Sequence, residues 1–221
     1  MPAWRPGLAD LPGRIPLFPL PGALLLPRAR IPLFIFEPRY LAMVEDCMKT
    51  SHRLIGMISA REAIGLPQPG PPQLAAVGCA GRLTEFAEAE DGRLMIALSG
   101  VSRFHLREEV SGFTPYRRAE VDWAPFARDL GPADEDPGFN RTSFVSLLQR
   151  FLDSHGLSAP ATELRDAPVG RLIDDAAMLL PLPPEDKQAL LEAPGLASRR
   201  ETLVTLMEFA LRGGNPKDPR Q

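Results

Sequence analysis

Residues 14–40, RIPLFPLPGALLLPRARIPLFIFEPRY, form the most apolar part of the chain and also one of its most proline-rich parts. A membrane-spanning helix needs about 20 uninterrupted apolar residues, and a secretory signal needs an apolar run of about 7 to 15. In this stretch no run without proline, glycine or charge exceeds four residues. The pattern therefore predicts short strands broken by turns, with proline at strand starts, edges or bulges.

The same stretch contains a formal Pro-x-x-Pro sequence at residues 16–19. Polyproline ligands work when they are exposed in a polar, disordered surround, whereas this one is embedded among leucine, phenylalanine and isoleucine. We therefore expect it to be part of a folded core.

Composition describes a globular protein with no general attraction to polyanions. The 221 residues are 44% hydrophobic and carry a net charge of -3, with acidic and basic residues interspersed. A core of this size can support one large domain or two small ones. We expect no nucleic-acid partner, no membrane association and a cytoplasmic location. Cys47 and Cys79 do not form a C-x-x-C pair, and we expect both to be buried, reduced thiols.

The first part of the chain alternates strand patterns with one helical pattern. Residues 38–49, PRYLAMVEDCMK, place apolar side chains at helical spacing, with Pro38 suited to the first helical position. Asp91-Gly92 predicts a tight hairpin turn between two strand patterns, and Ser99-Gly100 predicts a bulge that lets the second strand curve. Residues 118–123 alternate polar and apolar side chains, which predicts a strand with one buried face.

The second part is helical. Residues 124–139 carry proline, glycine and acidic residues without a period and are predicted to be a linker. Four helices are expected in residues 140–213, the first ended by Gly156, the second capped by Asp166 and the fourth begun by a capping box at Ser198–Glu201. Residues 214–221 are expected to be a disordered tail.

These segments together resemble a known family. IPLFPLPGALLLPRARIPLFIFEPRYLAMVEDC, VGCAGRLTEF, DGRLMIALSGVSRFHL and YRRAEVDW are similar to the N-terminal substrate-binding domain of the Lon proteases, and GRLIDDAAMLLPLPPEDKQALLEAPGLASRRETLVTLM resembles the helical part that follows it. The F-E-P-R-Y step from strand to helix is the most specific element. The chain is similar to the short stand-alone Lon-domain proteins of bacteria, and the same barrel module occurs in cereblon.

The resemblance implies an α+β fold. Residues 1–123 would form a mostly antiparallel β pseudo-barrel of the PUA-like kind with one helix, and residues 140–213 would form a helical bundle, with residues 124–139 as the linker between these two domains. The resemblance also implies that the chain binds polypeptide segments or a protein partner and takes part in protein quality control.

The sequence shows no catalytic motif. The ATPase cradle G-x-x-x-x-G-K-[ST] does not occur around Lys49, Lys187 or Lys217, and we expect all three lysines to be solvated, unlike the lysine of a serine-lysine peptidase. The three histidines are isolated from one another, so we expect no metal. We therefore expect no enzymatic activity and no cofactor.

Surface recognition is the remaining possibility. Glu37, Arg39 and Tyr40 are candidate binding residues beside the strand-to-helix turn. We favour a structural role for them, in which Arg39 pairs locally, Tyr40 packs and Glu37 lies at the helix entrance. The proline-rich segment GLPQPGPPQ is a second candidate. The first functional hypothesis is a non-catalytic adaptor or regulator that binds polypeptides through strand edges and adjacent clefts. The alternative is a small-ligand sensor with a pocket at the junction of barrel and bundle. The sequence does not indicate the oligomeric state.

Overall fold

A computed structural model describes residues 4, 6–61, 72–89 and 93–213. By its contacts the chain divides into two compact units. Unit 1 comprises Met1–Pro132 and Leu182–Leu191, and unit 2 comprises Ala133–Pro181 and Glu192–Gln221. The expected tail at 214–221 and the expected turn at Asp91-Gly92 lie outside the described residues.

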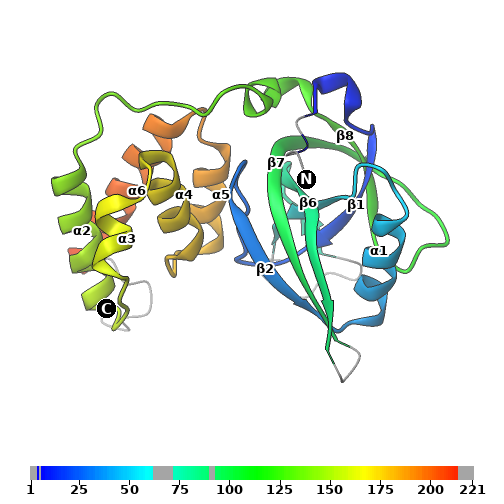
Figure 1. Cartoon of the computed structure of the whole chain (residues 1–221), viewed down its shortest axis with the longest axis horizontal. Coiled ribbons are helices and arrows are strands. Elements are labelled where there is room, and N and C mark those ends of the chain that lie inside the picture. The colour runs from blue at the N-terminus through cyan, green and yellow to red at the C-terminus, as the bar shows by residue number, and fades with distance from the viewer. Residues whose placement is uncertain (1–3, 5, 62–71, 90–92, 214–221) are drawn as a thin grey trace. The chain divides into compact units, whose positions relative to one another are not determined.

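Unit 1 is a strongly curved sheet with helices at its sides (Figure 1). Its elements are η1 (Leu8–Asp10), β1 (Arg14–Pro19), β2 (Arg30–Ile35), α1 (Pro38–Met48), β3 (Leu54–Ile58), β4 (Ala60–Arg61), β5 (Gln73–Leu74), β6 (Val77–Glu88), β7 (Leu94–Glu109), β8 (Arg118–Asp122), η2 (Ala124–Leu130) and α5 (Pro184–Glu192). The main sheet has the order β2-β7-β6-β3-β1-β8, and β7 also pairs with β8. That second pairing closes five strands into a barrel and leaves β2 as an added edge strand on β7.

The prolines of residues 14–40 fit this sheet in two ways. Pro32 lies in the edge strand β2, as the sequence predicted. Pro16 and Pro19 lie in β1, which is not an edge strand, so the expectation was wrong for this strand. The register explains why the prolines are accommodated: the first half of β1 pairs with β8 and the second half pairs with β3, so neither half needs a full ladder on both sides.

A long hairpin of β6 and β7 dominates the barrel. Figure 1 shows the two strands side by side and β7 bending over the barrel. Ala80 of β6 pairs with Ser102 of β7, but the next residue, Gly81, pairs with Gly100, so β7 has one extra residue at this point. This bulge is close to the one predicted at Ser99-Gly100. A Cβ atom on Gly100 would lie 2.0 Å from the Leu26 carbonyl oxygen, so only glycine lets the two backbones approach this closely.

The interior of the barrel is apolar. Its buried cluster contains Leu11, Ile15, Leu17, Leu54, Ile58, Ala75, Ala80, Phe104, Ala119, Val121 and Trp123. Ala119 and Val121 of β8 and the following Trp123 confirm the predicted apolar face of this strand. The Trp123 ring packs edge-on against Phe104, and its Nε1 donates to the Pro12 carbonyl oxygen at 2.9 Å. Cys47 and Cys79 are both buried, and no disulfide joins them.

Helix α1 matches its prediction. It starts with Pro38 at the first helical position after Glu37 as N-cap, and it buries Tyr40, Met43, Val44 and Cys47. Met43 and Val44 are fully buried. Burial raises the pKa of the Cys47 thiol to about 12, so this cysteine is not a reactive thiolate at neutral pH.

The segment predicted as a linker is partly ordered. Residues 124–130 form η2, and Asp129 of this element forms a buried ion pair with Arg103 of β7. The Arg103 guanidinium also donates to the Leu191 carbonyl oxygen of α5 at 3.1 Å. Helix α5, expected in the helical bundle, thus packs with the barrel elements in unit 1. The predicted boundaries at residues 123 and 140 stay a prediction for limited proteolysis.

Unit 2 is helical, and two of its predicted helix starts are wrong. It contains α2 (Arg141–Ser154), α3 (Ala161–Asp166), α4 (Val169–Leu179) and α6 (Leu196–Leu211). Gly156 has φ +65° and follows α2, as predicted for a helix end. Asp166 ends the short, unpredicted α3 instead of capping α4, whose N-cap is Pro168. Helix α6 begins at Leu196 with Gly195 as N-cap, so Ser198 is inside the helix.

Candidate functional site

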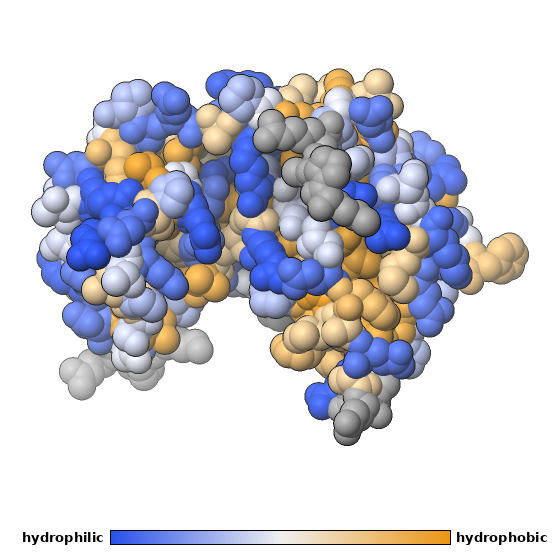
Figure 2. Space-filling view, in the orientation of Figure 1, coloured by the Kyte–Doolittle hydropathy of each residue, from blue (hydrophilic) through white to orange (hydrophobic). Residues whose placement is uncertain are grey.

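Four large apolar side chains are exposed where β2, β6 and β7 lie side by side. Phe34 is 67% exposed, Phe36 65%, Met95 47% and Phe86 45%. We call Phe34, Phe36 and Met95 the β2–β7 patch. Phe86 pairs with the buried Ile96, so it points to the other face of the sheet. Figure 2 shows hydrophobic residues gathered over the part of unit 1 where these strands run to their lower ends. Monomeric proteins rarely expose such side chains together without a binding role.

The strand register explains why the patch faces outward. Phe34 of β2 pairs directly with Met95 of β7, and Ala87 of β6 pairs with Met95 on its other side. Directly opposed residues point to the same face of a sheet, so this row crosses three strands. The alternate residues Leu33 and Ile35 are buried. Strand β2 is therefore apolar on both faces, although only one of them contributes to the core.

A surface hollow of about 530 Å³ adjoins this row. Its walls include Pro32, Phe86, Ala87 and Met95, and Arg30 of β2 forms an ion pair across β7 with Glu85 of β6. Both charged side chains are more than half exposed, so the pair adds polarity to the hollow but little stability. The hollow can accept apolar side chains beside a charged end.

The main-chain groups on the outer side of β2 are the second feature of the site. Among the described residues β2 pairs only with β7, so its other edge has no strand partner. Unpaired edges are templates for an extended peptide. Pro32 has no amide hydrogen, which removes one donor and limits indiscriminate pairing. An exposed apolar row and an available edge thus occur on the same strand.

The predicted residues Glu37, Arg39 and Tyr40 lie beside this site and contact one another. Arg39 Nε donates to Glu37 Oε2 at 2.8 Å, and its guanidinium lies 4.5 Å from the centre of the Tyr40 ring. Tyr40 is buried and packs edge-on against Phe18. Burial raises the pKa of Tyr40, so its ring is neutral at physiological pH. Their local contacts are structural, and a binding role stays a prediction. The segment GLPQPGPPQ lies mostly outside the described residues.

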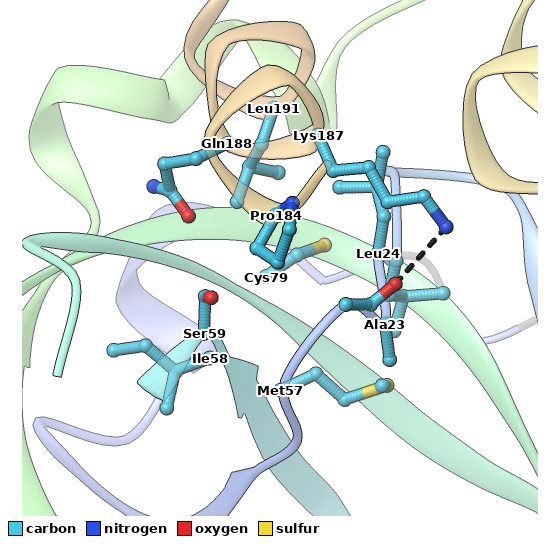
Figure 3. Close-up of a pocket in the computed structure, with 12 residues that line it drawn as sticks. Ala23, Leu24, Met57, Ile58, Ser59, Cys79, Pro184, Lys187, Gln188 and Leu191 are labelled. Carbon is cyan, nitrogen blue, oxygen red and sulfur yellow. Dashed lines mark hydrogen bonds between the residues drawn. The ribbon is translucent and has the colours of Figure 1, made fainter. Parts of the chain in front are cut away.

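Lys187 differs from its prediction because it is not solvated. It is partly buried, burial lowers its pKa, and its Nζ donates to the Gly22 carbonyl oxygen at 3.0 Å. Figure 3 shows this ammonium directed away from Ser59, which lies across the same hollow. Lys49 is exposed and pairs with Asp46 at 2.8 Å, while Lys217 lies outside the described residues. These two lysines thus donate to a backbone carbonyl and to a carboxylate, respectively.

The hollow in Figure 3, between α5 and the barrel strands, bears on the small-ligand hypothesis. It has room for about 10 Å³, which is roughly the space of one water. Gln188 Nε2 donates to the Val77 carbonyl oxygen at 3.1 Å beside it, so the hollow is largely filled by the contacts that dock α5. Within unit 1, this hollow is too small for an organic ligand.

Comparison with known proteins identifies the family. The profile of the ATP-dependent protease La (LON) substrate-binding domain matches residues 14–208. The chain belongs to the Lon substrate-binding domain family. Lon protease 2 of Myxococcus xanthus is 26% identical over 91% of this chain and 24% of its own length. Lon protease 1 of Bacillus subtilis is 24% identical over 88% of this chain and 25% of its own length.

The solved structures agree with the Lon-domain fold. A crystal structure of a Lon N-terminal domain protein from Xanthomonas campestris is 26% identical, with a TM-score of 0.57 and coverage of 87% of this chain and 97% of that chain. The N-terminal domain of the Mycobacterium avium complex Lon protease is 15% identical, with a TM-score of 0.61 and coverage of 88% and 98%. The predicted resemblance and the α+β fold class are confirmed. The chain spans about a quarter of the two Lon proteases named above.

The described residues contain neither a candidate membrane-spanning helix nor a cluster of metal ligands. No helix there combines the length and apolar character needed to cross a membrane. No group of three or more histidine, cysteine or acidic residues is placed to hold a metal ion in that part of the chain.

The β2–β7 patch was not predicted, although the sequence carries its signal. In PLFIFEP, four successive residues, 33–36, are all large and apolar. Because side chains alternate between the two faces of a strand, two of the four must point away from a single core.

Proposed function

We propose that this chain is a non-catalytic polypeptide-binding module that binds extended apolar segments of other proteins at the β2–β7 patch. It acts in the cytoplasm as an adaptor or regulator in protein quality control. The observation that supports the proposal most is the row of exposed Phe34 and Met95 beside the unpaired edge of β2. The family, named for substrate binding in an ATP-dependent protease, points to the same kind of ligand.

Binding would combine main-chain pairing with side-chain burial. An extended segment pairs with the outer edge of β2 and places alternate side chains over the patch. Each large apolar side chain that it buries contributes about 1.5 to 3 kcal/mol, and ordering of the segment offsets part of this gain. The expected dissociation constant for a short segment is about 10 µM to 1 mM. Weak, sequence-tolerant binding suits recognition of unfolded segments.

The absence of catalysis is part of the proposal. No phosphate cradle precedes any lysine in the sequence, Lys187 donates to the Gly22 carbonyl oxygen, and Lys49 is exposed and pairs with Asp46. Purified protein should neither hydrolyse ATP nor cleave unfolded casein. ATP hydrolysis or casein cleavage that copurifies with the folded chain, and that is lost when one lysine is changed, would contradict this.

The binding test uses a fluorescent, extended peptide rich in leucine and phenylalanine, with anisotropy as the readout. Phe34→Ser and Met95→Ser should each weaken binding about tenfold, because each removes an exposed apolar contact. Phe113→Ser is the matched control, since Phe113 is fully exposed on the loop before β8 and outside the patch. Methylating alternate backbone amides of the peptide should also weaken binding. Equal losses for Phe34→Ser and Phe113→Ser would refute the patch as the site.

A further inference from the structure

A small polar pocket lies in unit 1, where the end of α1 and the turn after it meet the outer side of β1 and β8. Its volume is about 170 Å³, and its polar lining includes Arg14, Asp46, His52, Tyr116 and Arg118. Pockets for drug-sized ligands span about 300 to 1,000 Å³, so this one has room only for a small chemical group.

Arg118 has donors that no acceptor in the described part of the chain satisfies. Its Nε is buried without a hydrogen-bond partner, and no ion pair among the described residues involves its guanidinium. Glu120, on the same face of β8, instead accepts from Arg14 Nη2 at 2.9 Å. The terminal nitrogens of Arg118 are not enclosed in this way, so an acceptor can reach them, and a small rotation of the side chain would bring Nε to it. Because a buried donor without an acceptor is costly, Arg118 is suited to bind one.

His52 adds a second donor to the same pocket. The Leu54 amide donates to His52 Nδ1 at 3.3 Å. A ring nitrogen that accepts carries no hydrogen, so the neutral imidazole has its hydrogen on Nε2. Burial lowers the pKa of His52, which keeps the ring neutral at pH 7. Among the described residues Nε2 has no hydrogen-bond partner, so His52 offers a free, uncharged donor beside the cation.

The other charged groups of the lining already have partners. Asp46 Oδ1 accepts from Lys49 Nζ at 2.8 Å, and Asp46 Oδ2 accepts from the Tyr116 hydroxyl at 2.8 Å. The bond from Lys49 lowers the pKa of Asp46, so this carboxylate is ionised, but both of its oxygens are engaged. Arg14 is neutralised by its own carboxylate partner. The lining and these partners together therefore keep one uncompensated positive charge, that of Arg118.

We propose that this pocket binds a carboxylate group, with Arg118 as the counter-ion and His52 Nε2 as a second donor. A guanidinium holds a planar carboxylate through two parallel hydrogen bonds, and one negative charge matches the one uncompensated cation. The carboxylate is that of a small free acid or of a peptide C-terminus, since the pocket recognises the group that both share. The site has no residue in common with the β2–β7 patch, so this proposal does not depend on the proposed function.

Other ions fit the pocket less well. A metal cation would be repelled by Arg118 and would find both oxygens of Asp46 engaged. A phosphate monoester carries about -1.5 to -2 at pH 7, which exceeds the available positive charge beside Asp46. The carbonyl end of α1 would also repel an anion, but the amide and hydroxyl of Thr50 both donate to the Cys47 carbonyl oxygen there and reduce that effect. A group with a single negative charge is therefore favoured.

The test follows the ring nitrogens of His52 by NMR in the full chain while sodium propionate replaces sodium chloride at constant ionic strength. The spectrum of His52→Gln identifies the signals. Propionate should shift them with a dissociation constant of about 1 to 10 mM, whereas propionamide, which has the same shape without the charge, should bind at least about tenfold more weakly. Acetyl-trialanine with a free C-terminal carboxylate, compared with its C-terminal amide, tests the peptide source.

Variants locate the binding. Arg118→Gln should weaken propionate binding at least about tenfold, and Arg118→Lys should weaken it about three- to fivefold, because lysine keeps the charge but loses the planar fork. The matched control is Arg107→Gln, which changes an exposed arginine of β7 outside the pocket and should leave the affinity unchanged. Melting curves establish that each variant is folded, and the comparison of propionate with propionamide needs no variant.

The outcomes separate the two sources and decide the proposal. Binding of propionate alone assigns a free acid, and binding of the peptide acid but not of its amide assigns a chain end; either result supports the site. The proposal is overturned if neither carboxylate shifts the His52 signals or if propionamide binds as tightly as propionate. It is also overturned if Arg107→Gln loses as much affinity as Arg118→Gln, because the binding would then reflect general surface charge.

Discussion

Asp129→Ala should be one of the most destabilising single changes in unit 1. The Arg103 and Asp129 side chains are only 6% and 8% exposed, and they are joined by bonds from Nε to Oδ2 at 2.9 Å and from Nη2 to Oδ1 at 2.8 Å. Asp129 Oδ2 also accepts from the backbone amide of Arg103 at 2.9 Å. Removing the carboxylate leaves a buried cation and a buried amide without these acceptors.

The expected loss follows from that burial. Removing one partner of a buried ion pair costs about 3 to 5 kcal/mol, whereas an exposed pair contributes about 0 to 1 kcal/mol. For a protein of this size, a loss of 3 to 5 kcal/mol lowers the melting temperature by about 6 to 20 °C. The matched control is Glu120→Ala. The distance from Arg14 Nη2 to Glu120 Oε1 is also short, at 2.9 Å, but both side chains are about half exposed.

Urea denaturation of both variants and of Arg103→Met/Asp129→Leu provides the test. The double variant should recover more than half of the loss, since apolar replacement of a buried ion pair is often neutral or stabilising. Some loss should persist because the Leu191 carbonyl oxygen no longer receives its bond from Arg103. If Asp129→Ala loses less than about 1 kcal/mol, as Glu120→Ala should, the pair is not the buried anchor of η2.

Other predictions address separate features. Gly100→Ala should lower the free energy of unfolding by about 1 to 3 kcal/mol, because its Cβ would overlap a backbone carbonyl oxygen, and urea denaturation would measure it. Ser198→Ala should change that free energy by less than about 0.5 kcal/mol, since the residue is inside α6 and is not its cap; a loss near 1 kcal/mol would restore the capping role. Burial and the bond to Asp46 raise the pKa of Tyr116 to about 12. The free energy of unfolding should therefore fall between about pH 10 and 12, because the tyrosine of the unfolded chain loses its proton first. Tyr116→Phe should reduce this fall in alkaline unfolding curves. A glutamate-specific protease should cut first at the exposed Glu135, after the ordered η2; earlier cleavage inside either unit would contradict the proposed boundary.

The sequence predicted the features that depend on local chemistry. The start of α1 at Pro38, the left-handed Gly156 and the alternation in β8 each follow from a few adjacent residues. The start of α6 was predicted wrongly. The capping-box pattern lies at Ser198–Glu201, but the helix has already begun at the buried Leu196. A matching motif cannot act as a cap when upstream packing extends the helix.

The parts that were missed depend on distant residues. The buried Arg103–Asp129 pair joins positions that the sequence assigned to a strand and a linker. The β2–β7 patch depends on a register that places Phe34 opposite Met95, and neither residue alone distinguishes a core position from a surface one. The binding hypothesis was therefore predictable from kinship, while the surface that would perform it required the fold.

The place of α5 in unit 1 has a consequence for synthesis on the ribosome. Unit 1 takes residues up to 132 and then 182–191, so its last piece emerges only after most of unit 2. At about 5 to 20 residues per second, the barrel strands wait roughly 3 to 12 s for that helix. During this interval the Arg103 guanidinium has no Leu191 carbonyl to bind, and the strand surface that α5 covers is open to chaperones. A nascent chain stalled before residue 182 should therefore bind chaperones more than one stalled well beyond residue 191.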